Sequence, residues 1–179
     1  EPVVMAGNLA ASLCILGRDL GKDEVRYQQP LIGAAGQKVR RTLQQVLAPF
    51  APEDKPWFTA GLTHYCITNT VPFKPVGNAP FSEATQESCR PLVERFLTDL
   101  WKGTILMPLG LGALEWCRPY GAGTVDSFAA LPLPAWHERE GYIEIRGKVV
   151  RLLPLPHTSP LSQYSRHFPE WLAARIAQV

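Results

Sequence analysis

Three polar residues, each at or just beyond the end of an apolar run, could together do hydrogen-bonding and electrostatic chemistry. They are Asp19, Asn69 and His157. A carboxylate can stabilise positive charge or orient a water molecule, an amide can pair with a donor–acceptor edge, and an imidazole can hydrogen-bond a developing anion. This set indicates neither a metal site nor a covalent nucleophile. Cys66 lies inside an apolar run and is expected to be a core thiol.

The apolar runs predict the strands of a sheet. Short runs occur at 12–16, 62–71, 104–109 and 149–155, and the second is rich in β-branched and aromatic residues. Amphipathic stretches lie between them, so strands and helices alternate along the chain. This alternation is typical of a parallel sheet with helices on both faces. In such a sheet the residues beyond the carboxyl ends of the strands form the ligand crevice, which would bring the three polar residues together.

The helices are predicted from apolar stripes, caps and prolines. Expected helices are a stripe beginning at Val39, a stripe behind the N-cap Ser82 that ends at Gly103, a short helix at 113–118 and a closing helix from Pro169. Residues 22–29 are expected to form a polar loop. Residues 142–149 are expected to form a hairpin that leads into the last strand.

Length and composition restrict the class of protein. At 179 residues, 46% hydrophobic and 19% charged, the chain is expected to form one domain, residues 1–179. A net charge of +2 permits nucleic-acid binding but does not argue for it. No run is apolar enough to span a membrane and no signal peptide is visible, so we expect an intracellular protein with no membrane partner. The four cysteines include no CxxC pair, so no zinc site is predicted. Three of them lie within apolar runs or stripes, which is typical of buried thiols in a reducing compartment.

Four motifs resemble the uracil-DNA glycosylase superfamily, most closely its bacterial and archaeal family 4 type. They are GRDLG at 17–21, PLIGAAGQ at 30–37, ITNTVPFKPVGNAPFSEATQESCRP at 67–91 and HTSPLSQY at 157–164. The resemblance covers nearly the whole chain. It implies a three-layer α/β/α sandwich with a central, mainly parallel four-stranded sheet. We accordingly expect a monomeric, cytoplasmic, nucleoid-associated enzyme that excises a damaged or deaminated base from DNA.

The resemblance also implies roles for individual residues. Asp19 matches the catalytic aspartate of family 1 enzymes and would favour positive charge on the sugar. His157 matches the histidine that hydrogen-bonds uracil O2 and would stabilise the departing base. The positions matched to base binding are Asn69, Leu31, Leu20 and Gly21, and among them Asn69 corresponds to the asparagine that pairs with the uracil edge.

A further set of matched positions is implied to contact DNA. They are Ser159, Pro160, Leu161, Ser162, Gly33 and Gly36, with Leu161 as the wedge of a loop that enters the minor groove. The serine hydroxyls and the amides near 33–36 could bind phosphates or serve as ordinary caps. Basic residues expected to be exposed could form a DNA face or a solvated surface, and these are Arg40, Arg41, Lys74 and Arg166.

Several positions depart from the family pattern. Arg18 stands where family 4 has an acidic residue, Leu20 replaces a proline, and Leu31 replaces the phenylalanine that stacks on the base. Thr158 replaces a proline of the histidine loop, and Gly21 stands where family 1 has a tyrosine that blocks the thymine C5 methyl. We therefore expect altered base preference or weak activity, without strict exclusion of C5-substituted bases.

The cofactor of family 4 is not expected in this chain. Its four-cysteine iron–sulfur cluster finds a match only at Cys89, Phe73 occupies a second cluster position, and the N-terminal pair is absent. We therefore expect no cluster and no other cofactor.

Two other functional classes are compatible with such a sheet. A non-catalytic nucleic-acid or nucleotide binder is favoured by Arg18 and Leu31, whereas the complete set of polar residues at the strand ends argues against it. A nucleotide-cofactor enzyme is disfavoured, because GRDLG lacks the GxGxxG spacing and no acidic residue ends the second strand.

Overall fold

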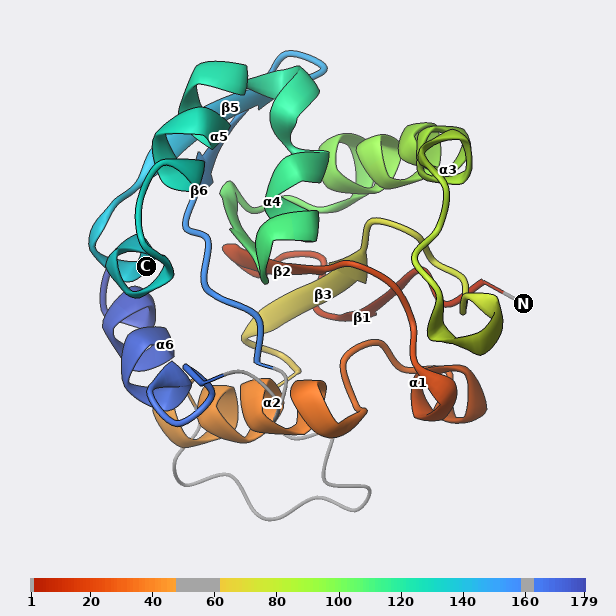
Figure 1. The fold of residues 1–179 in the computed structure, drawn as a ribbon, viewed down its shortest axis with the longest axis horizontal. Helices are drawn as coiled ribbons and strands as arrows, with labels where there is room; N and C mark the ends of the chain where they lie inside the picture. Colours follow the sequence, from red (N-terminus) through yellow and green to blue (C-terminus); the bar gives the residue numbers. More distant parts are fainter. Residues whose placement is uncertain (1, 48–61, 159–162) are drawn as a thin grey trace.

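A computed structural model describes residues 2–47, 62–158 and 163–179 and shows a mixed sheet between two layers of helices (Figure 1). The strands are β1 (Met5–Gly7), β2 (Leu13–Gly17), β3 (Tyr65–Asn69), β4 (Ile105–Pro108), β5 (Gly141–Ile145) and β6 (Lys148–Leu152). They form one six-stranded sheet in the order β1-β3-β2-β4-β6-β5.

The inner four strands of this sheet are parallel, as the alternation of strands and helices predicted. At the edges, β1 runs antiparallel to β3 and β5 runs antiparallel to β6. The expected four-stranded sheet is therefore wrong in its strand number, because each edge of the parallel part is covered by an added antiparallel strand.

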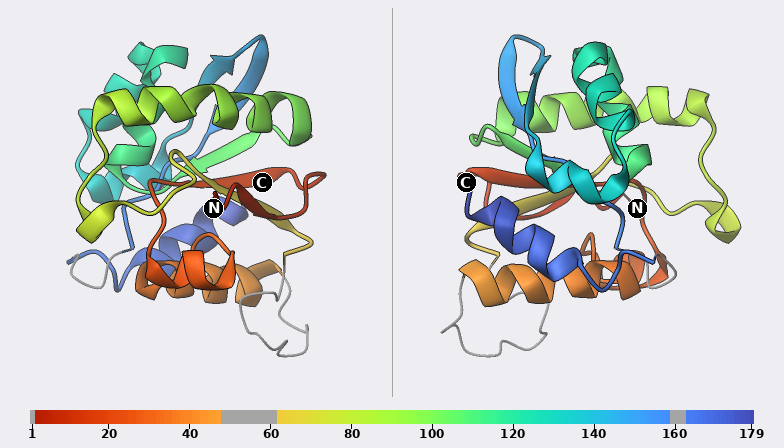
Figure 2. Two further views of the ribbon diagram at one scale, coloured as in Figure 1. Left: turned by 90° about the vertical axis from the view of Figure 1, so that its right-hand side faces the viewer. Right: turned by 60° about the vertical axis from the view of Figure 1, so that its left-hand side comes forward.

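Helices cover both faces of the sheet, as the two views in Figure 2 show. The helices are α1 (Lys22–Tyr27), α2 (Ala34–Leu47), α3 (Glu83–Arg95), α4 (Leu111–Trp116), α5 (Ala122–Ala129) and α6 (Phe168–Ile176). The shorter helical turns are η2 (Val76–Asn78), η3 (Phe96–Leu100), η4 (Arg118–Tyr120) and η5 (Leu133–Glu138). Helices α3, α4 and α5 lie on one side, whereas α1, α2 and α6 lie on the other.

Alternation along the strands gives each face of the sheet its own core. In β2, Leu13 and Ile15 belong to the core that includes residues of α2 and α6. Cys14 and Leu16 belong to the opposite core, which includes residues of α3, α4 and α5. All five residues of β2 are buried, as expected for a strand of a sheet covered on both faces.

Two of the expected elements are wrong. Residues 22–29, expected as a loop, contain helix α1, whose buried residue is the charged Glu24 rather than an apolar one. The helix capped by Ser82 does not end at Gly103, because α3 passes into the π-helical turn η3 and ends at the C-cap Trp101. Gly103 instead packs on backbone, and an added Cβ would lie 2.3 Å from the carbonyl oxygen of Ala11.

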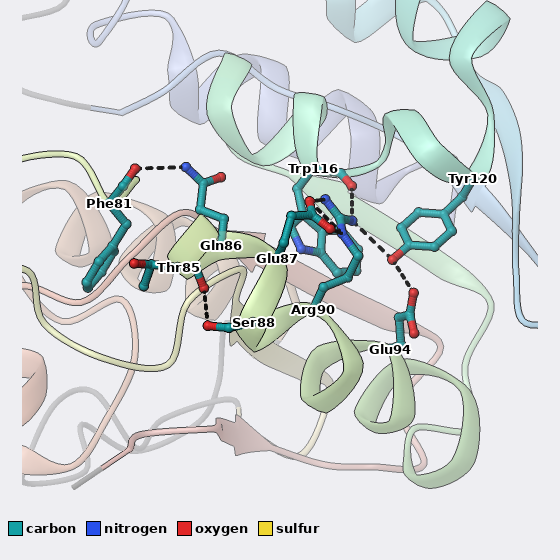
Figure 3. Close-up of polar contacts among 9 residues, drawn as sticks. All are labelled: Phe81, Thr85, Gln86, Glu87, Ser88, Arg90, Glu94, Trp116 and Tyr120. Carbon is teal, nitrogen blue, oxygen red and sulfur yellow. Dashed lines mark hydrogen bonds and ion pairs between the residues drawn. The ribbon is translucent and has the colours of Figure 1, made fainter. Parts of the chain in front are cut away.

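A polar and aromatic cluster joins α3 to the end of α4 (Figure 3). Arg90 pairs with Glu87, donates to the Trp116 carbonyl at 2.8 Å and donates to the Tyr120 hydroxyl at 3.1 Å. The Tyr120 hydroxyl in turn donates to Glu94 Oε1 at 2.6 Å. The Arg90 guanidinium also lies over the Trp116 ring, 4.9 Å from its centroid. The cluster therefore fixes the C-terminal end of α4, the helix that follows β4.

Candidate active site

The parallel strands bring the predicted polar residues to one edge of the sheet. At the carboxyl ends of β2 and β3, Gly17 is the register partner of Asn69, and Asp19 follows in the turn after β2. On the other side of β2, parallel bridging continues beyond β4 and β6 as far as Leu155, two residues before His157. The predicted gathering of these side chains at the strand ends is confirmed.

These strand ends surround a pocket of about 570 Å³. The predicted residues that line it are Asp19, Gly21, Leu31, Gly33, Gly36, Asn69 and His157. Leu20, a buried residue of the core, is not among the residues that line it. Ser159, Pro160, Leu161 and Ser162 lie outside the described residues. The volume falls within the range of about 300–1,000 Å³ that is usual for small-ligand sites.

Asn69 presents a buried amide with unfilled hydrogen-bonding capacity. The residue is only 1% exposed, and neither Oδ1 nor Nδ2 has a partner among the residues that the structure describes. Leaving such a group desolvated and unpaired costs roughly 1–3 kcal/mol. A ligand that placed a donor beside an acceptor against this amide would recover that cost. Asn69 is therefore suited to bind a flat heterocycle through its polar edge.

The turn that carries Asp19 is hydrogen-bonded to the end of β3. Thr70 donates from its amide to the Gly17 carbonyl at 2.9 Å and from its hydroxyl to the Arg18 carbonyl at 2.5 Å. Val71 donates its amide to the same Arg18 carbonyl at 3.1 Å. Arg18 Nε donates to Asp19 Oδ2 at 2.9 Å. The backbone immediately before Asp19 is thus held beside the end of β3, and one carboxylate oxygen is paired with a guanidinium.

His157 stands at the opposite side of the strand ends, against Gly110. An added Cβ at Gly110 would lie 2.9 Å from His157 Cβ, and its φ of +84° also disfavours a side chain. The pKa of His157 is lowered, first because the surrounding protein desolvates the ring and then by the charge of Arg18, while Asp19 opposes the change. At neutral pH the imidazole is therefore uncharged, so the ring that lines the pocket has one N–H donor and one nitrogen acceptor.

Glu24 is a site residue that the sequence did not point to. From α1 its Oε1 accepts the amides of Ile32 at 3.2 Å and Gly33 at 2.8 Å. Its Oε2 is buried without a hydrogen-bond partner among the described residues, 2.4 Å from where a Cβ of Gly21 would stand. The carboxylate therefore fills the space beside Gly21 and engages the Gly33 amide, one of the amides for which phosphate binding and capping were both left open.

Arg40 corrects another expectation, because it was predicted to be exposed and is only 2% exposed. It donates to the carbonyls of Pro30 at 2.6 Å and Leu31 at 3.0 Å, which satisfies the buried guanidinium. Together with Glu24 it holds Leu31, at the pocket wall, in the left-handed region with a φ of 56°. Of the other expected basic residues, Arg41 and Arg166 are exposed, whereas Lys74 is half-buried and donates to the Pro75 carbonyl at 3.0 Å.

The thiols do not form a cluster site. All four cysteines are free and buried, where burial was predicted for three of them. Within residues 2–47, 62–158 and 163–179, no three His, Cys, Asp or Glu side chains come together in a way that could hold a metal ion. An iron–sulfur cluster with four thiolate ligands therefore does not fit the described residues.

No helix within residues 2–47, 62–158 and 163–179 is long and apolar enough to cross a membrane.

Comparison with known proteins identifies a family. Residues 4–179 match a protein-family model described as the Uracil DNA glycosylase superfamily. The matched range contains every residue that lines the pocket. A search of the curated proteins finds no match.

Proposed function

Because the chain belongs to the uracil-DNA glycosylase superfamily, we propose that it hydrolyses the N-glycosidic bond of uracil or another deaminated base flipped out of DNA. Members of this superfamily are in general DNA glycosylases. The observation that carries the proposal is the buried, unpaired amide of Asn69, which lines one pocket with Asp19 and His157.

The Asn69 amide would bind the base. Uracil, hypoxanthine and xanthine each present an N–H beside a carbonyl oxygen, so Oδ1 can accept from the ring while Nδ2 donates to it. Extruding the nucleotide from the duplex costs a few kcal/mol, which is least for a mismatched or damaged base. Pairing with an amide that has no other partner among the described residues supports the extruded state against that cost.

The remaining two polar residues would act on the bond that breaks. When the bond between C1′ and the base nitrogen breaks, the base departs with the electron pair as an anion, and the sugar becomes positively charged. The neutral His157 ring donates a hydrogen bond to the anion, and the Asp19 carboxylate stabilises the positive charge. Water then adds its oxygen to C1′, and its released proton leaves to solvent or to the departed base.

The ion pair between Arg18 and Asp19 favours a second candidate function. The 2.9 Å contact engages one carboxylate oxygen and offsets its charge, which weakens stabilisation of a positive sugar. The second candidate is a member of the fold that binds nucleic acid or nucleotides without efficient hydrolysis. Both candidates predict binding to DNA, so only a cleavage measurement separates them.

A single-turnover cleavage assay tests the proposal. Duplex oligonucleotides would carry uracil, hypoxanthine, xanthine or a thymine mismatch, and abasic product would be followed over time. We expect product from the wild type and roughly 100-fold slower release from both Asp19→Asn and His157→Ala. His64→Ala, an exposed histidine outside the pocket, is the matched control and should keep the wild-type rate. A wild type that binds these duplexes but releases no base would favour the second candidate.

A further inference from the structure

We propose that Arg18 binds a backbone phosphate of the flipped nucleotide through the terminal nitrogens of its guanidinium, while its Nε holds Asp19 toward the sugar. The inference rests on the proposed function, because it concerns the nucleotide that would enter the same pocket. It assigns a positioning role to a residue that departs from the family pattern.

Three pocket residues become more exposed in the order in which the base, sugar and phosphate of an entering nucleotide would meet them. Asn69 is 1% exposed, the Asp19 side chain is 15% exposed and the Arg18 side chain is 51% exposed. All three line one pocket. A nucleotide that enters base first would place its base at the buried amide, its sugar at the carboxylate and its phosphate at the mouth. Arg18 is the residue of this series that remains at the mouth.

The hydrogen bond from Arg18 to Asp19 leaves the two terminal nitrogens of the guanidinium available. Nε is engaged by Asp19 Oδ2 at 2.9 Å, and in the described part of the chain the two terminal nitrogens have no hydrogen-bond partner. Those nitrogens carry four of the five guanidinium N–H donors, in a planar fork that matches phosphate oxygens. One side chain can therefore bind a carboxylate on one edge and a phosphate on the other.

The stem and backbone of Arg18 are also held in place. Its carbonyl accepts the hydroxyl and amide bonds from Thr70 and Val71. Its stem packs on Gly112, where an added Cβ would lie only 3.0 Å from Arg18 Cδ. The charge of Arg18 contributes to the lowered pKa of His157, so the guanidinium acts on the opposite side of the pocket as well. A fixed cation with unfilled donors loses less conformational entropy on binding than a mobile one.

The side chains that line the pocket are more acidic than basic, which disfavours the approach of a phosphate. Three carboxylates line it, from Asp19, Asp23 and Glu24. Lys22 also lines the pocket, but no contact joins it to Asp19 among the described residues. Arg18 therefore offsets the acidic lining where the sugar–phosphate backbone of the flipped nucleotide would pass.

The test combines the removal of the Arg18 charge with the removal of the charge of one DNA phosphate, and it compares the affinities for DNA. The probe is a duplex with one 2′-fluoro-2′-deoxyuridine, which resists cleavage, and with a neutral methylphosphonate at one phosphate flanking that nucleotide. In the wild type we expect one such replacement to weaken binding roughly tenfold or more. Arg18→Gln should bind unmodified DNA more weakly than the wild type by a similar factor. The methylphosphonate should not weaken its binding further. Its slope of log affinity against log salt should fall by about one.

Two further variants sharpen the test. Arg18→Lys should keep the salt slope but recover only part of the affinity, because it lacks the planar fork. Arg26→Gln removes the same charge from an exposed position on α1 outside the pocket, and it should retain the full methylphosphonate effect.

The outcomes separate this inference from the proposed function. Equal loss in the wild type and Arg18→Gln at every neutralised phosphate would overturn the inference. Slower base release by Arg18→Gln with an unchanged salt slope would also overturn it. That result would mean that the guanidinium stabilises the departing base instead of binding a phosphate. Coupling to one phosphate without any base release would support the phosphate contact and reject hydrolysis. A wild type that does not prefer the probe over undamaged duplex would overturn the phosphate contact for a flipped uracil nucleotide, and the cleavage assay on hypoxanthine and xanthine would then decide the proposed function.

Discussion

Gly17 lies so close to Asn69 that an added Cβ at position 17 would stand 2.2 Å from Asn69 Oδ1. The two residues are register partners at the ends of β2 and β3, and the missing side chain of one leaves room for the amide of the other. Real Cβ atoms do not approach an oxygen so closely, so any side chain at position 17 must displace the amide or the strand end.

Gly17→Ala should therefore impair base binding while the sheet remains folded. We expect base release to slow by at least about tenfold, the equivalent of about 1.4 kcal/mol, because the amide would turn from its place in the pocket. Single-turnover cleavage beside a circular dichroism spectrum would measure both effects. Gly123→Ala in α5 is the control, since its added Cβ meets nothing within 4 Å. Equal rates for Gly17→Ala and the control would show that the amide does not need its present position.

Asn69→Leu should raise stability and abolish base release together. Leucine has a similar size and removes two buried polar atoms that lack partners in the described structure, so we expect the free energy of unfolding to rise by about 1–3 kcal/mol. Thr70→Val removes a hydroxyl that does have a partner, the Arg18 carbonyl, and should instead lower it by about 1 kcal/mol. Urea unfolding measures both changes. A loss of stability in Asn69→Leu as large as that in Thr70→Val would contradict a role in ligand binding for the unpaired amide.

The titration of His157 should respond in opposite directions to its two charged neighbours. Arg18 lowers the pKa of His157 and Asp19 raises it. Arg18→Gln should therefore raise this pKa and Asp19→Asn should lower it further, as followed by NMR of the imidazole protons. Glu144→Gln, on the exposed side of β5, should leave the titration unchanged. A shift of the same sign in both pocket variants would mean that these charges do not act on the ring.

The same lowered pKa affects stability at acid pH. An unfolded histidine takes up its proton near about pH 6.5, whereas the folded protein binds that proton only at lower pH. As the pH falls below about 6.5, the unfolded state binds more protons, so the free energy of unfolding should fall. His157→Gln should remove this part of the pH dependence, as measured by urea unfolding at a series of pH values. An unchanged slope in His157→Gln would contradict the assignment.

The sequence predicted the placement of Asp19, Asn69 and His157 because each follows an apolar run and the carboxyl ends of parallel strands meet at one edge. It did not predict β1, which has only three residues and is defined by its pairing with β3. A strand so short carries no alternation of its own, so its existence depends on a partner that is distant in the sequence.

The residues that hold the pocket wall in place were harder to predict than the polar residues that line the pocket. Arg40 follows a residue of the apolar stripe in α2, and its charge was taken as a sign of exposure although carbonyls of the 30–31 segment satisfy it inside the protein. Glu24 lies in a helix of six residues, too short for an apolar stripe. Both residues bind backbone groups, and such contacts leave no pattern in the side chains of the segment that they hold.

Glu24→Ala should loosen the wall of the pocket formed by Leu31. The substitution would leave the amides of Ile32 and Gly33 without their acceptor, and each buried unpaired group costs roughly 1–3 kcal/mol. We expect a lower free energy of unfolding, faster amide exchange at these two residues and weaker binding of lesion DNA. Glu144→Ala, on the exposed side of β5, is the control and should change stability by less than about 0.5 kcal/mol. Because Oε1 carries both bonds, Glu24→Gln should preserve them through its remaining carbonyl oxygen. If Glu24→Gln lost as much stability as Glu24→Ala, the negative charge rather than these hydrogen bonds would be what the segment requires.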